Sequence, residues 1–342
     1  MKTLCSILVG LLLTIPTFAQ WKPQSVDTKA SFRAVSVASP DVVWIGGTKG
    51  QFVCTTNGGQ TWQTGTVPDA QDCDFRDVQA IDAQTALLMS AGPAEKGQAR
   101  IYKTTNAGQT WQLVYQTNRT GIFFDGMDFW DAQHGIVFSD PVDGKWAVLT
   151  TDDGGKSWQP VPPGNLPMMQ PGEAAFAASG TSLVVQGKRN VWIASGGMTG
   201  GTGRVFRSSD RGKSWFVSTV PLPAGEATGL FGMQFFSARA GVVVGGNYQE
   251  EKQPGPNAAI TRDGGRTWER LTETKPPGLK EAVALLPGDR LLVVGPSGTA
   301  LSADQGQTWQ QLDSEGFHSV GCAKGTCYAV GATGKVSKQV FK

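Results

Sequence analysis

Residues 55–62 read TTNGGQTW, and close copies of this octapeptide return five times along the chain. Each copy keeps a Thr or Ser, an Asp or Asn two positions later, a Gly, and a final Thr or Ser followed by Trp. The further copies are TTNAGQTW (104–111), TDDGGKSW (151–158), SSDRGKSW (208–215), TRDGGRTW (261–268) and SADQGQTW (302–309). Six copies of one pattern in 342 residues do not arise by chance, so the chain is built from internal repeats.

Each octapeptide, called the box below, has the composition of a structural turn. The Asp or Asn can accept hydrogen bonds from backbone N–H groups of its own turn, and the Gly can take a conformation that a Cβ disfavours. The Trp is a large side chain to bury, with an N–H that needs a partner. A calcium site at Asp152 and Asp153 is not expected, because the full loop of ligands is absent. The residues expected to hold these turns together are Asn57, Trp62, Asn106, Trp111, Asp153, Trp158, Asp210, Trp215, Asp263, Trp268, Asp304 and Trp309.

The segments around each box predict four antiparallel strands per repeat. Residues 32–67, FRAVSVASPDVVWIGGTKGQFVCTTNGGQTWQTGTV, show three apolar strands separated by turns, then the box, then a more polar strand. Four such strands form one blade of a β-propeller. Successive box Trp residues lie 49, 47, 57, 53 and 41 residues apart, which brackets the usual length of a blade.

The two ends of the chain together supply a further blade. Residues 317–339 contain the strands FHSVGC, CYAVG and KVSKQ, but no box follows them. The missing fourth strand matches WKPQSV (21–26), which resembles the residues after each box, such as WQTGTV. We therefore expect an all-β, seven-bladed propeller of four-stranded antiparallel blades, forming a single domain over residues 20–342. The N-terminal strand is expected to complete the last blade.

The first 19 residues have the three regions of a secretory signal peptide. Lys2 precedes an apolar run from Leu4 to about Ile15, and Thr17-Phe18-Ala19 provides a small-residue cleavage site. We expect cleavage after Ala19 and export to the periplasm or beyond. A lipoprotein is not expected, because Cys5 lies at the start of the apolar run and not at a cleavage point. The run is also too short for a comfortable membrane span.

The composition supports an all-β chain and excludes some partners. Forty-five Gly, 19 Pro and only 17% charged residues are typical of a turn-rich β-protein. The net charge of +2 includes Lys2, so the mature chain is close to neutral. Nucleic acid and anionic membranes are therefore not expected as partners, since both need a basic face. We expect a monomer without stable membrane insertion.

Four cysteines follow the expected cleavage site: Cys54, Cys73, Cys322 and Cys327. An even number in an exported chain is compatible with two disulfides, for which three connectivities exist. Cys322 and Cys327 flank a tight turn between two short apolar runs, which favours a bond between them and leaves Cys54 with Cys73. Buried free thiols are the alternative for these residues.

The boxes resemble the Asp-boxes of the sialidase and BNR-repeat proteins. The longer segments DFRDVQA (74–80), FFDGMDFWDAQHGIVFSDPVDGKW (123–146) and PGEAAFAASGT (171–181) resemble the photosystem II stability/assembly factor family and its exported bacterial relatives. This resemblance extends over residues 21–342. It implies the propeller fold. It also implies, for the photosynthetic members, assembly chaperones that bind a membrane-protein intermediate.

Propellers place binding sites on one face, in the loops that enter the innermost strands and those between second and third strands. The second set of loops covers 91–100, 139–145, 195–204 and 245–258. The candidate binding residues at this channel mouth are Arg33, Arg76, Asp125, Glu173, Glu226 and His318, with Asp77 and Glu281 in the same set of entering loops. Together they form a polar funnel suited to a ligand, although a solvated channel mouth is polar even without one.

Arg33 and Arg76 both follow a Phe at the start of an inner strand, so they are expected on the same side of the channel. There they could hold one anionic group between them. Alternatively, each Arg pairs with a neighbouring acid, Asp77 or a carboxylate of an entering loop, and holds adjacent blades together.

The sequence contains no readable catalytic, cofactor or metal site. A sialidase needs a Tyr nucleophile; only Tyr248 lies near the mouth, and it belongs to a long loop. A glycosidase that uses the carboxylates of Asp125 and Glu173 is a rival interpretation. The Gly-rich stretch 196–204 lacks the ending of a phosphate-binding loop, and His318 alone offers no zinc site. We therefore expect a non-enzymatic propeller that binds a protein partner through this face; a glycan-binding or glycoside-hydrolase propeller is the alternative.

Overall fold

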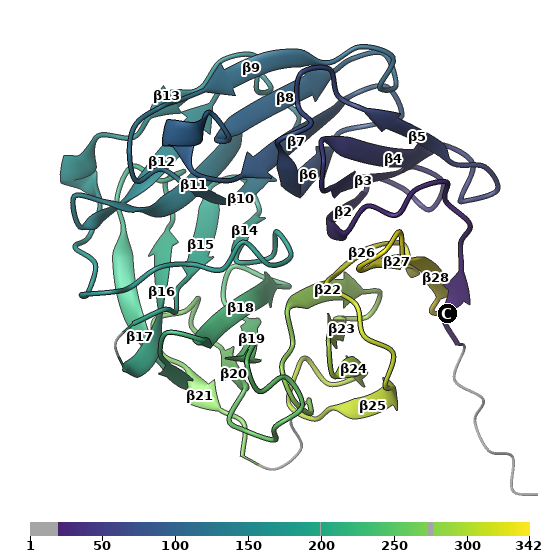
Figure 1. The fold of residues 1–342 in the computed structure, drawn as a ribbon. Helices are drawn as coiled ribbons and strands as arrows, with labels where there is room; N and C mark the ends of the chain where they lie inside the picture. Colours follow the sequence, from purple (N-terminus) through teal and green to yellow (C-terminus); the bar gives the residue numbers. More distant parts are fainter. Residues whose placement is uncertain (1–19, 199, 273–275) are drawn as a thin grey trace, which may run out of the picture.

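The computed structural model describes residues 20–198, 200–272 and 276–342; the expected signal peptide lies outside these residues. Within them the strands form seven four-stranded antiparallel sheets, arranged as blades around a central axis (Figure 1). The helical elements in these ranges are two 3-10 turns, η1 (Ala94–Lys96) and η2 (Pro163–Asn165). The predicted seven-bladed, all-β propeller is confirmed. Among the described residues, no helix has the length and apolar character needed to cross a membrane.

Blades 1 to 3 each run from an innermost strand at the centre of the ring to an outer strand (Figure 1). Blade 1 contains β2 (Phe32–Val37), β3 (Val43–Gly47), β4 (Gln51–Thr55) and β5 (Gln63–Thr66). Blade 2 contains β6 (Asp74–Ala80), β7 (Ala86–Ala91), β8 (Arg100–Thr104) and β9 (Gln112–Gln116). Blade 3 contains β10 (Phe124–Phe129), β11 (Gly135–Val142), β12 (Lys145–Thr151) and β13 (Gln159–Pro160).

Blades 4 to 6 repeat this order. Blade 4 contains β14 (Leu183–Gln186), β15 (Asn190–Ala194), β16 (Gly201–Ser208) and β17 (Phe216–Ala224). Blade 5 contains β18 (Thr228–Phe235), β19 (Gly241–Asn247), β20 (Ala258–Thr261) and β21 (Glu269–Arg270). Blade 6 contains β22 (Ala282–Leu286), β23 (Arg290–Gly295), β24 (Gly298–Ser302) and β25 (Gln310–Asp313).

Blade 7 joins the two ends of the chain, as the sequence predicts. It contains β26 (Ser319–Ala323), β27 (Thr326–Val330), β28 (Val336–Val340) and the N-terminal β1 (Lys22–Pro23). β1 pairs with β28 through Lys22 opposite Lys338. Trp21 is 6% exposed, and its indole N–H donates to Thr299 Oγ1 of blade 6 at 3.0 Å. Both termini therefore belong to one blade, which closes the ring.

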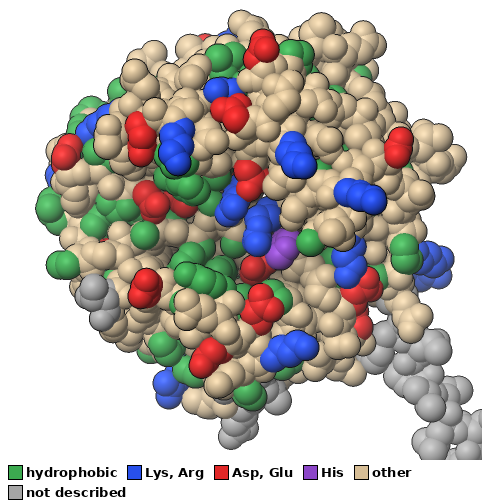
Figure 2. Space-filling view, viewed as in Figure 1, with side chains coloured by type: hydrophobic (Ala, Val, Ile, Leu, Met, Phe, Trp, Pro, Cys, Tyr) green, Lys and Arg blue, Asp and Glu red, His purple; other side chains and the backbone are tan. Residues whose placement is uncertain are grey.

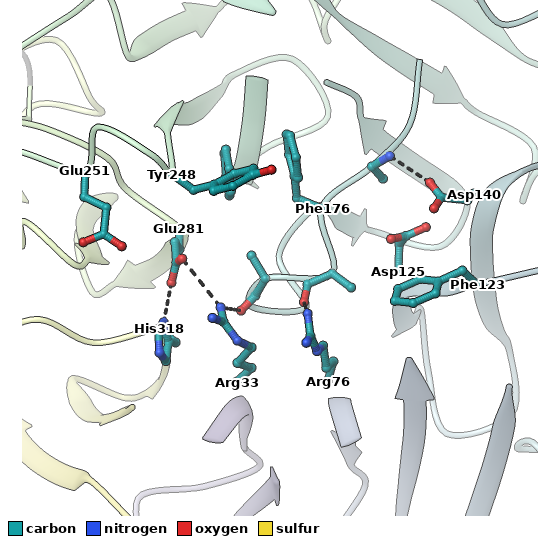
Figure 3. A pocket seen from close by; sticks show the side chains of 14 residues that line it. Arg33, Arg76, Phe123, Asp125, Asp140, Phe176, Tyr248, Glu251, Glu281 and His318 are labelled. Carbon is teal, nitrogen blue, oxygen red and sulfur yellow. Dashed lines mark hydrogen bonds and ion pairs between the residues drawn. The ribbon is translucent and has the colours of Figure 1, made fainter. Parts of the chain in front are cut away.

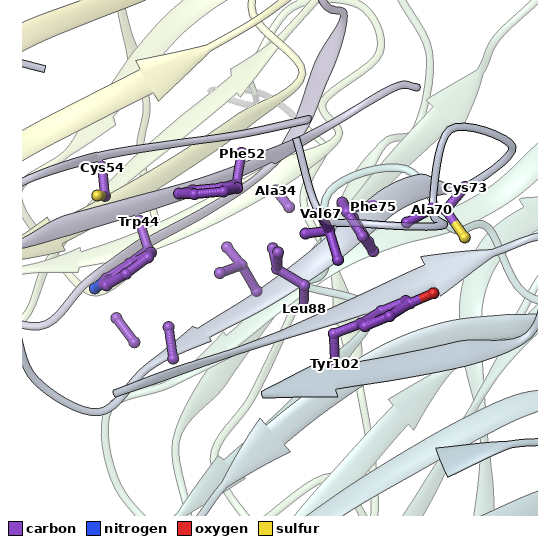
Figure 4. Packing of buried hydrophobic residues seen from close by; sticks show 13 residues of the cluster. Ala34, Trp44, Phe52, Cys54, Val67, Ala70, Cys73, Phe75, Leu88 and Tyr102 are labelled. Carbon is purple, nitrogen blue, oxygen red and sulfur yellow. The ribbon is translucent and has the colours of Figure 1, made fainter. Parts of the chain in front are cut away.

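The hydrophobic core is divided among the interfaces between neighbouring blades, and every box Trp lies at one of them. Trp111 of blade 2 packs against Trp44 and Phe52 of blade 1, with ring centroids 5.9 and 5.1 Å apart. Figure 4 shows the cluster at this interface, which combines residues of both blades. The other five box Trp residues likewise join the cluster shared with the preceding blade. Trp21 takes this position for blade 7 against blade 6.

The box turns have the hydrogen bonds that their composition predicts. Asp153 Oδ1 accepts from the backbone N–H groups of Lys156 and Ser157 at 2.9 and 3.0 Å, and its Oδ2 accepts from Ser157 Oγ at 2.7 Å. Thr151 Oγ1 donates to Asp153 and accepts from the N–H of Gly155. Partial burial alone would raise the pKa of Asp153, but these hydrogen bonds outweigh it and lower the pKa to about 2.

The box tryptophans are less uniform than expected. Trp158, Trp215, Trp268 and Trp309 are buried, whereas Trp62 and Trp111 are only partly buried. Three indole N–H groups find a partner: those of Trp215 and Trp309 donate to a carbonyl of their own turn, and that of Trp268 donates to Ser218 Oγ. Those of Trp62, Trp111 and Trp158 have none among the described residues. Packing against the preceding blade is therefore the property that all six share.

One of the two expected disulfides is present. Cys322 and Cys327 face each other across the β26–β27 hairpin and are bonded. The expected bond between Cys54 and Cys73 is wrong, because both are buried free thiols. Cys54 is the second-last residue of β4, while Cys73 immediately precedes β6, and Figure 4 draws them at opposite ends of their cluster. Burial raises the pKa of the Cys54 thiol to about 12.

Removing the closing strand should open the ring. Deletion of residues 20–26 removes β1 and Trp21, which exposes the edge of β28, and we expect a large fall in melting temperature or aggregation. Trp21→Ala alone should lower the free energy of unfolding by roughly 3–5 kcal/mol, whereas Lys22→Ala, at an exposed position, should have little effect. A deletion variant that melts like the chain of residues 20–342 in calorimetry would contradict this account of closure.

The boxes should contribute to stability through both burial and hydrogen bonding. Trp268→Ala is expected to lower the free energy of unfolding by roughly 3–5 kcal/mol. Asp153→Ala should lower it by about 1–3 kcal/mol, since two backbone donors lose their acceptor. The control is Asp152→Ala, whose side chain is 86% exposed. Urea unfolding curves measure all three, and equal stability of the Asp152 and Asp153 variants would refute the role of the turn.

Candidate functional site

Irregularities in the innermost strands turn one side chain of several blades toward the ring centre. In β2, β6, β10 and β18 the pairing with the second strand shifts by one residue near the strand start. The extra residue at each shift is Arg33, Arg76, Asp125 or Phe231. Such β-bulges re-aim side chains and are frequent beside functional sites. All four bulged residues line the same pocket.

This central pocket has a volume of about 450 Å³, within the usual range for ligand sites. Its charged lining consists of Arg33, Arg76, Asp125, Asp140, Glu251, Glu281 and His318, and its aromatic lining of Phe123, Phe176, Phe231 and Tyr248. Figure 3 shows these side chains converging from several blades. In the space-filling view, charged side chains and a histidine gather around the hollow at the centre of this face (Figure 2).

A segment between blades 3 and 4 crosses the centre of the ring and forms part of the pocket wall. This central segment (residues 174–182) consists mainly of small residues, which can approach several inner strands closely. Ser179 Oγ donates to the carbonyl of Glu281 in front of blade 6 at 2.7 Å. The carbonyl of Ser179 accepts a hydrogen bond from Ser319 Oγ of blade 7 at 2.9 Å. The segment therefore links blades on the far side of the ring to blade 4.

The two arginines hold this segment. Arg33 Nη1 donates to the carbonyl of Ala178 at 3.4 Å and lies 3.6 Å from Glu281 Oε1. Arg76 Nη1 donates to the carbonyl of Ala177 at 3.1 Å, and its Nε donates to Asp74 Oδ2 at 2.8 Å. The expectation that the Arg side chains lie on the same side is confirmed. Both guanidinium groups already have an acidic partner, but it is not Asp77, whose carboxylate accepts from Val78 and Met127 backbone N–H groups.

Glu281 and His318 complete the polar part of the pocket. Each stands immediately before an innermost strand, β22 or β26, at the position where other blades carry the bulged residue. His318 Nδ1 lies 2.8 Å from Glu281 Oε2, and the Glu281 side chain is only 6% exposed. Glu281 therefore joins His318 to Arg33 from three different blades (Figure 3).

Two carboxyl groups lie on the other side of the pocket. Asp125 is 1% exposed; burial raises its pKa well above the usual value, and the neighbouring Asp140 raises it further. Asp140 Oδ1 accepts from the N–H of Ala175 in the central segment at 3.1 Å. Burial raises the pKa of Asp140 to about 6.

An aromatic wall faces the charged groups. Phe176 of the central segment stacks on Phe231 with ring centroids 4.2 Å apart, and the Tyr248 ring meets Phe176 edge-on at 6.0 Å. Tyr248 is 44% exposed. The pocket thus offers an apolar surface and charged groups of both signs at one place.

Two of the six candidate residues are not part of this pocket. Glu173 is buried in an ion pair with Arg204, and its oxygens also accept from Ser195 Oγ and the N–H of Gln170. Glu226 is exposed in the turn between β17 and β18 and does not line the pocket. The carboxylate pair of Asp125 and Glu173, considered for glycoside hydrolysis, is therefore not assembled. Arg33, Arg76, Asp125 and His318 are brought together as expected.

The sequence placed Tyr248 near the mouth, but it did not single out Asp140, Glu251 or Phe176. Asp140, Tyr248 and Glu251 come from two of the four variable loops, 139–145 and 245–258, while the other two loops do not contribute. Phe176 belongs to an Ala-rich stretch without strand-like alternation, so its central position has no local signal. The length of the connection from β13 to β14 was the sequence feature that could have indicated a segment with a role of its own. Across the described ranges, no cluster of three or more potential metal-ligating His, Cys, Asp or Glu residues exists.

Comparisons with known proteins agree with this architecture. The family model for photosynthesis system II assembly factor YCF48 matches residues 13–119. A solved structure of YCF48 bound to a D1 peptide is similar, with a TM-score of 0.68 and 18% identity over 95% of this chain and 98% of that chain. The chain resembles the YCF48 assembly factors.

Other solved structures share the fold with lower identity. YCF48 from Cyanidioschyzon merolae has a TM-score of 0.66 and 14% identity, covering 94% of this chain and 98% of its own. A catalytically inactive virginiamycin B lyase from Staphylococcus aureus with quinupristin has a TM-score of 0.63 and 10% identity, covering 94% and 99%. These likenesses show the fold alone. The comparison with curated proteins finds no significant match.

The ion pair of Arg33 should stabilise the ring. Arg33→Gln leaves the nearly buried carboxylate of Glu281 without its guanidinium partner, so we expect the free energy of unfolding to fall by about 1–3 kcal/mol. Arg262→Gln is the matched control, because its pair with Glu269 lies at the surface with side chains 59% and 69% exposed and should contribute little. Thermal melts compare the two variants. Equal melting temperatures would show that Arg33 does not stabilise the fold.

Proposed function

We propose that this chain is a non-enzymatic β-propeller that binds a segment of a protein partner in its central pocket and acts as an assembly factor. The observation that carries the proposal is the convergence of bulged residues from blades 1, 2, 3 and 5 on one pocket. Bulges that serve only the fold need not aim their extra side chains at a common point. Here they provide two guanidinium groups, one carboxyl group and one aromatic ring.

The character of the pocket suits a peptide better than a purely polar or purely apolar ligand. The exposed Tyr248 and the adjacent Phe176 offer an aromatic surface, a residue type typical of binding sites in protein interfaces. The side chains of Arg33 and Arg76 remain 27% and 32% exposed, so they can also contact a bound segment. The backbone and side chains of a short peptide present groups for both kinds of contact.

The pocket is also held in place before a ligand arrives. Its walls come from inner strands fixed by the closed ring and from the central segment, whose carbonyls are bound by Arg33, Arg76 and Ser319. A preformed site lowers the entropic cost of binding. This rigidity favours recognition of a flexible segment by a fixed surface.

The similarity to YCF48 supports a protein partner. A propeller of the same fold is known with a D1 peptide bound, and the family model of this assembly factor matches part of the chain. We propose that the protein is exported by its N-terminal leader and acts as a monomer on a partner of the cell envelope. The proposal includes no cofactor.

Site-specific cross-linking tests the binding face. We expect a photoreactive phenylalanine analogue at Tyr248 to form a discrete adduct with a protein of the envelope fraction, because this side chain borders the pocket. The same analogue at Phe216, which is 56% exposed on β17, is the control and should form none. Excess unlabelled protein should compete for the adduct.

Two results would contradict the proposal. Identical adducts from Tyr248 and Phe216 would show that the pocket face has no special role. Hydrolysis of a panel of glycosides, lost in Asp125→Asn, would show that the protein is an enzyme.

A further inference from the structure

Asp125 occupies the same structural position as Arg33 and Arg76 but has the opposite charge. All three are the extra residue of a β-bulge at the start of an innermost strand, in blades 1, 2 and 3. All three line the central pocket. The ring thus places a carboxyl group where the two preceding blades place guanidinium groups.

The carboxyl group of Asp125 is incompletely satisfied. Its Oδ2 atom is buried and has no hydrogen-bond partner among the described residues. A buried polar atom without a partner destabilises the fold, and native proteins keep few of them. Because this atom belongs to a residue of the pocket wall, a ligand group can supply the missing partner.

The two arginines that line the pocket are engaged with other groups. Arg76 is bound to Asp74 and to the carbonyl of Ala177, and Arg33 to Glu281 and the carbonyl of Ala178. Asp140 stands beside Asp125 in the pocket wall and uses Oδ1 for the N–H of Ala175. This side of the pocket therefore carries two neighbouring carboxyl groups without a cation of their own (Figure 3).

We propose that Asp125 and Asp140 form a subsite for a cationic group, an ammonium or guanidinium, of the bound protein segment. Phe123 lies next to Asp125 (Figure 3), so it can pack against the apolar stem of a Lys or Arg side chain. The subsite gives the proposed peptide pocket a preference for a basic residue. The inference rests on the proposed function, since it assigns a ligand class to the same pocket.

The protonation of these groups supplies an additional readout. In the free protein, burial raises the pKa of both Asp125 and Asp140. The positive charge of Arg76 lowers the pKa of Asp125 but does not outweigh its burial. A bound cation favours the ionised carboxylates, so binding should release protons. The affinity for a basic ligand should therefore weaken as the pH falls through about 6, where Asp140 protonates.

Selection from a random heptapeptide phage library tests the subsite with three forms of the mature protein. These are the wild type, Asp125→Asn, which keeps the shape of the side chain, and Asp152→Asn, an exposed control with an 86% exposed side chain. We expect Lys or Arg to be enriched at one peptide position on the wild type and the control, and this enrichment to disappear on Asp125→Asn. Circular dichroism checks that each variant is folded. If Asp125→Asn does not fold, Asp140→Asn is used in its place.

Synthetic peptides then separate the sources of the cation. If the subsite binds a Lys or Arg side chain, acetylation of the peptide N-terminus should leave the affinity of the peptide unchanged. If it binds the terminal amine, acetylation should abolish binding. Citrulline in place of arginine, or norleucine in place of lysine, should weaken binding at least roughly tenfold, as expected for loss of a charged hydrogen bond.

The outcomes are distinguishable. Peptides without a basic preference, or with the same preference on Asp125→Asn, would overturn the subsite and leave the proposed function standing. A library that yields no binding peptide on any form would overturn the proposed function and the subsite with it.

Discussion

The packing of one Trp per blade against the preceding blade is the interaction on which the remaining structure depends. Each of the seven hydrophobic clusters that lie between blades is shared by two neighbours, so no blade has a core of its own. A ring of such shared cores is complete only when the last blade meets the first. Trp62 of blade 1 packs into the cluster shared with blade 7 and makes that contact. Trp21, although it precedes every box in the sequence, packs the last blade against blade 6 and brings the N-terminal strand to the last blade.

Closure in turn determines where functional groups can stand. Seven innermost strands are held side by side around one axis, and a bulge in any of them points its extra residue at the same space. The box turns can therefore stay uniform while the bulged residue varies from Arg to Asp to Phe. The repeated residues carry stability, and the residues that differ between repeats carry the chemistry of the pocket.

Short-range patterns made most of the fold readable from the sequence. The boxes predicted the blades, the resemblance of WKPQSV to the post-box strands predicted closure, and the shared FR context placed Arg33 and Arg76 together. Long-range contacts were not readable. Glu173 is turned from the pocket by Arg204, which lies 31 positions away in the chain, and Cys54 and Cys73 stand at opposite ends of one cluster. The central segment has no periodicity, because its small residues contact many blades instead of one sheet.

The central segment explains why Asp125 and Asp140 form no ion pair within the described part of the chain although two arginines line the same pocket. Its carbonyl oxygens accept hydrogen bonds from Arg33 and Arg76, and the N–H of its Ala175 donates to one oxygen of Asp140. The arginines are thereby oriented toward the segment, and Asp125 keeps an oxygen without a partner. In a looser structure an arginine would turn to this carboxylate and remove the unsatisfied group. The rigid ring prevents that rearrangement, since both the inner strands and the segment are held at several blades at once. A site that is incomplete until a ligand binds is therefore a consequence of the same closure that stabilises the fold.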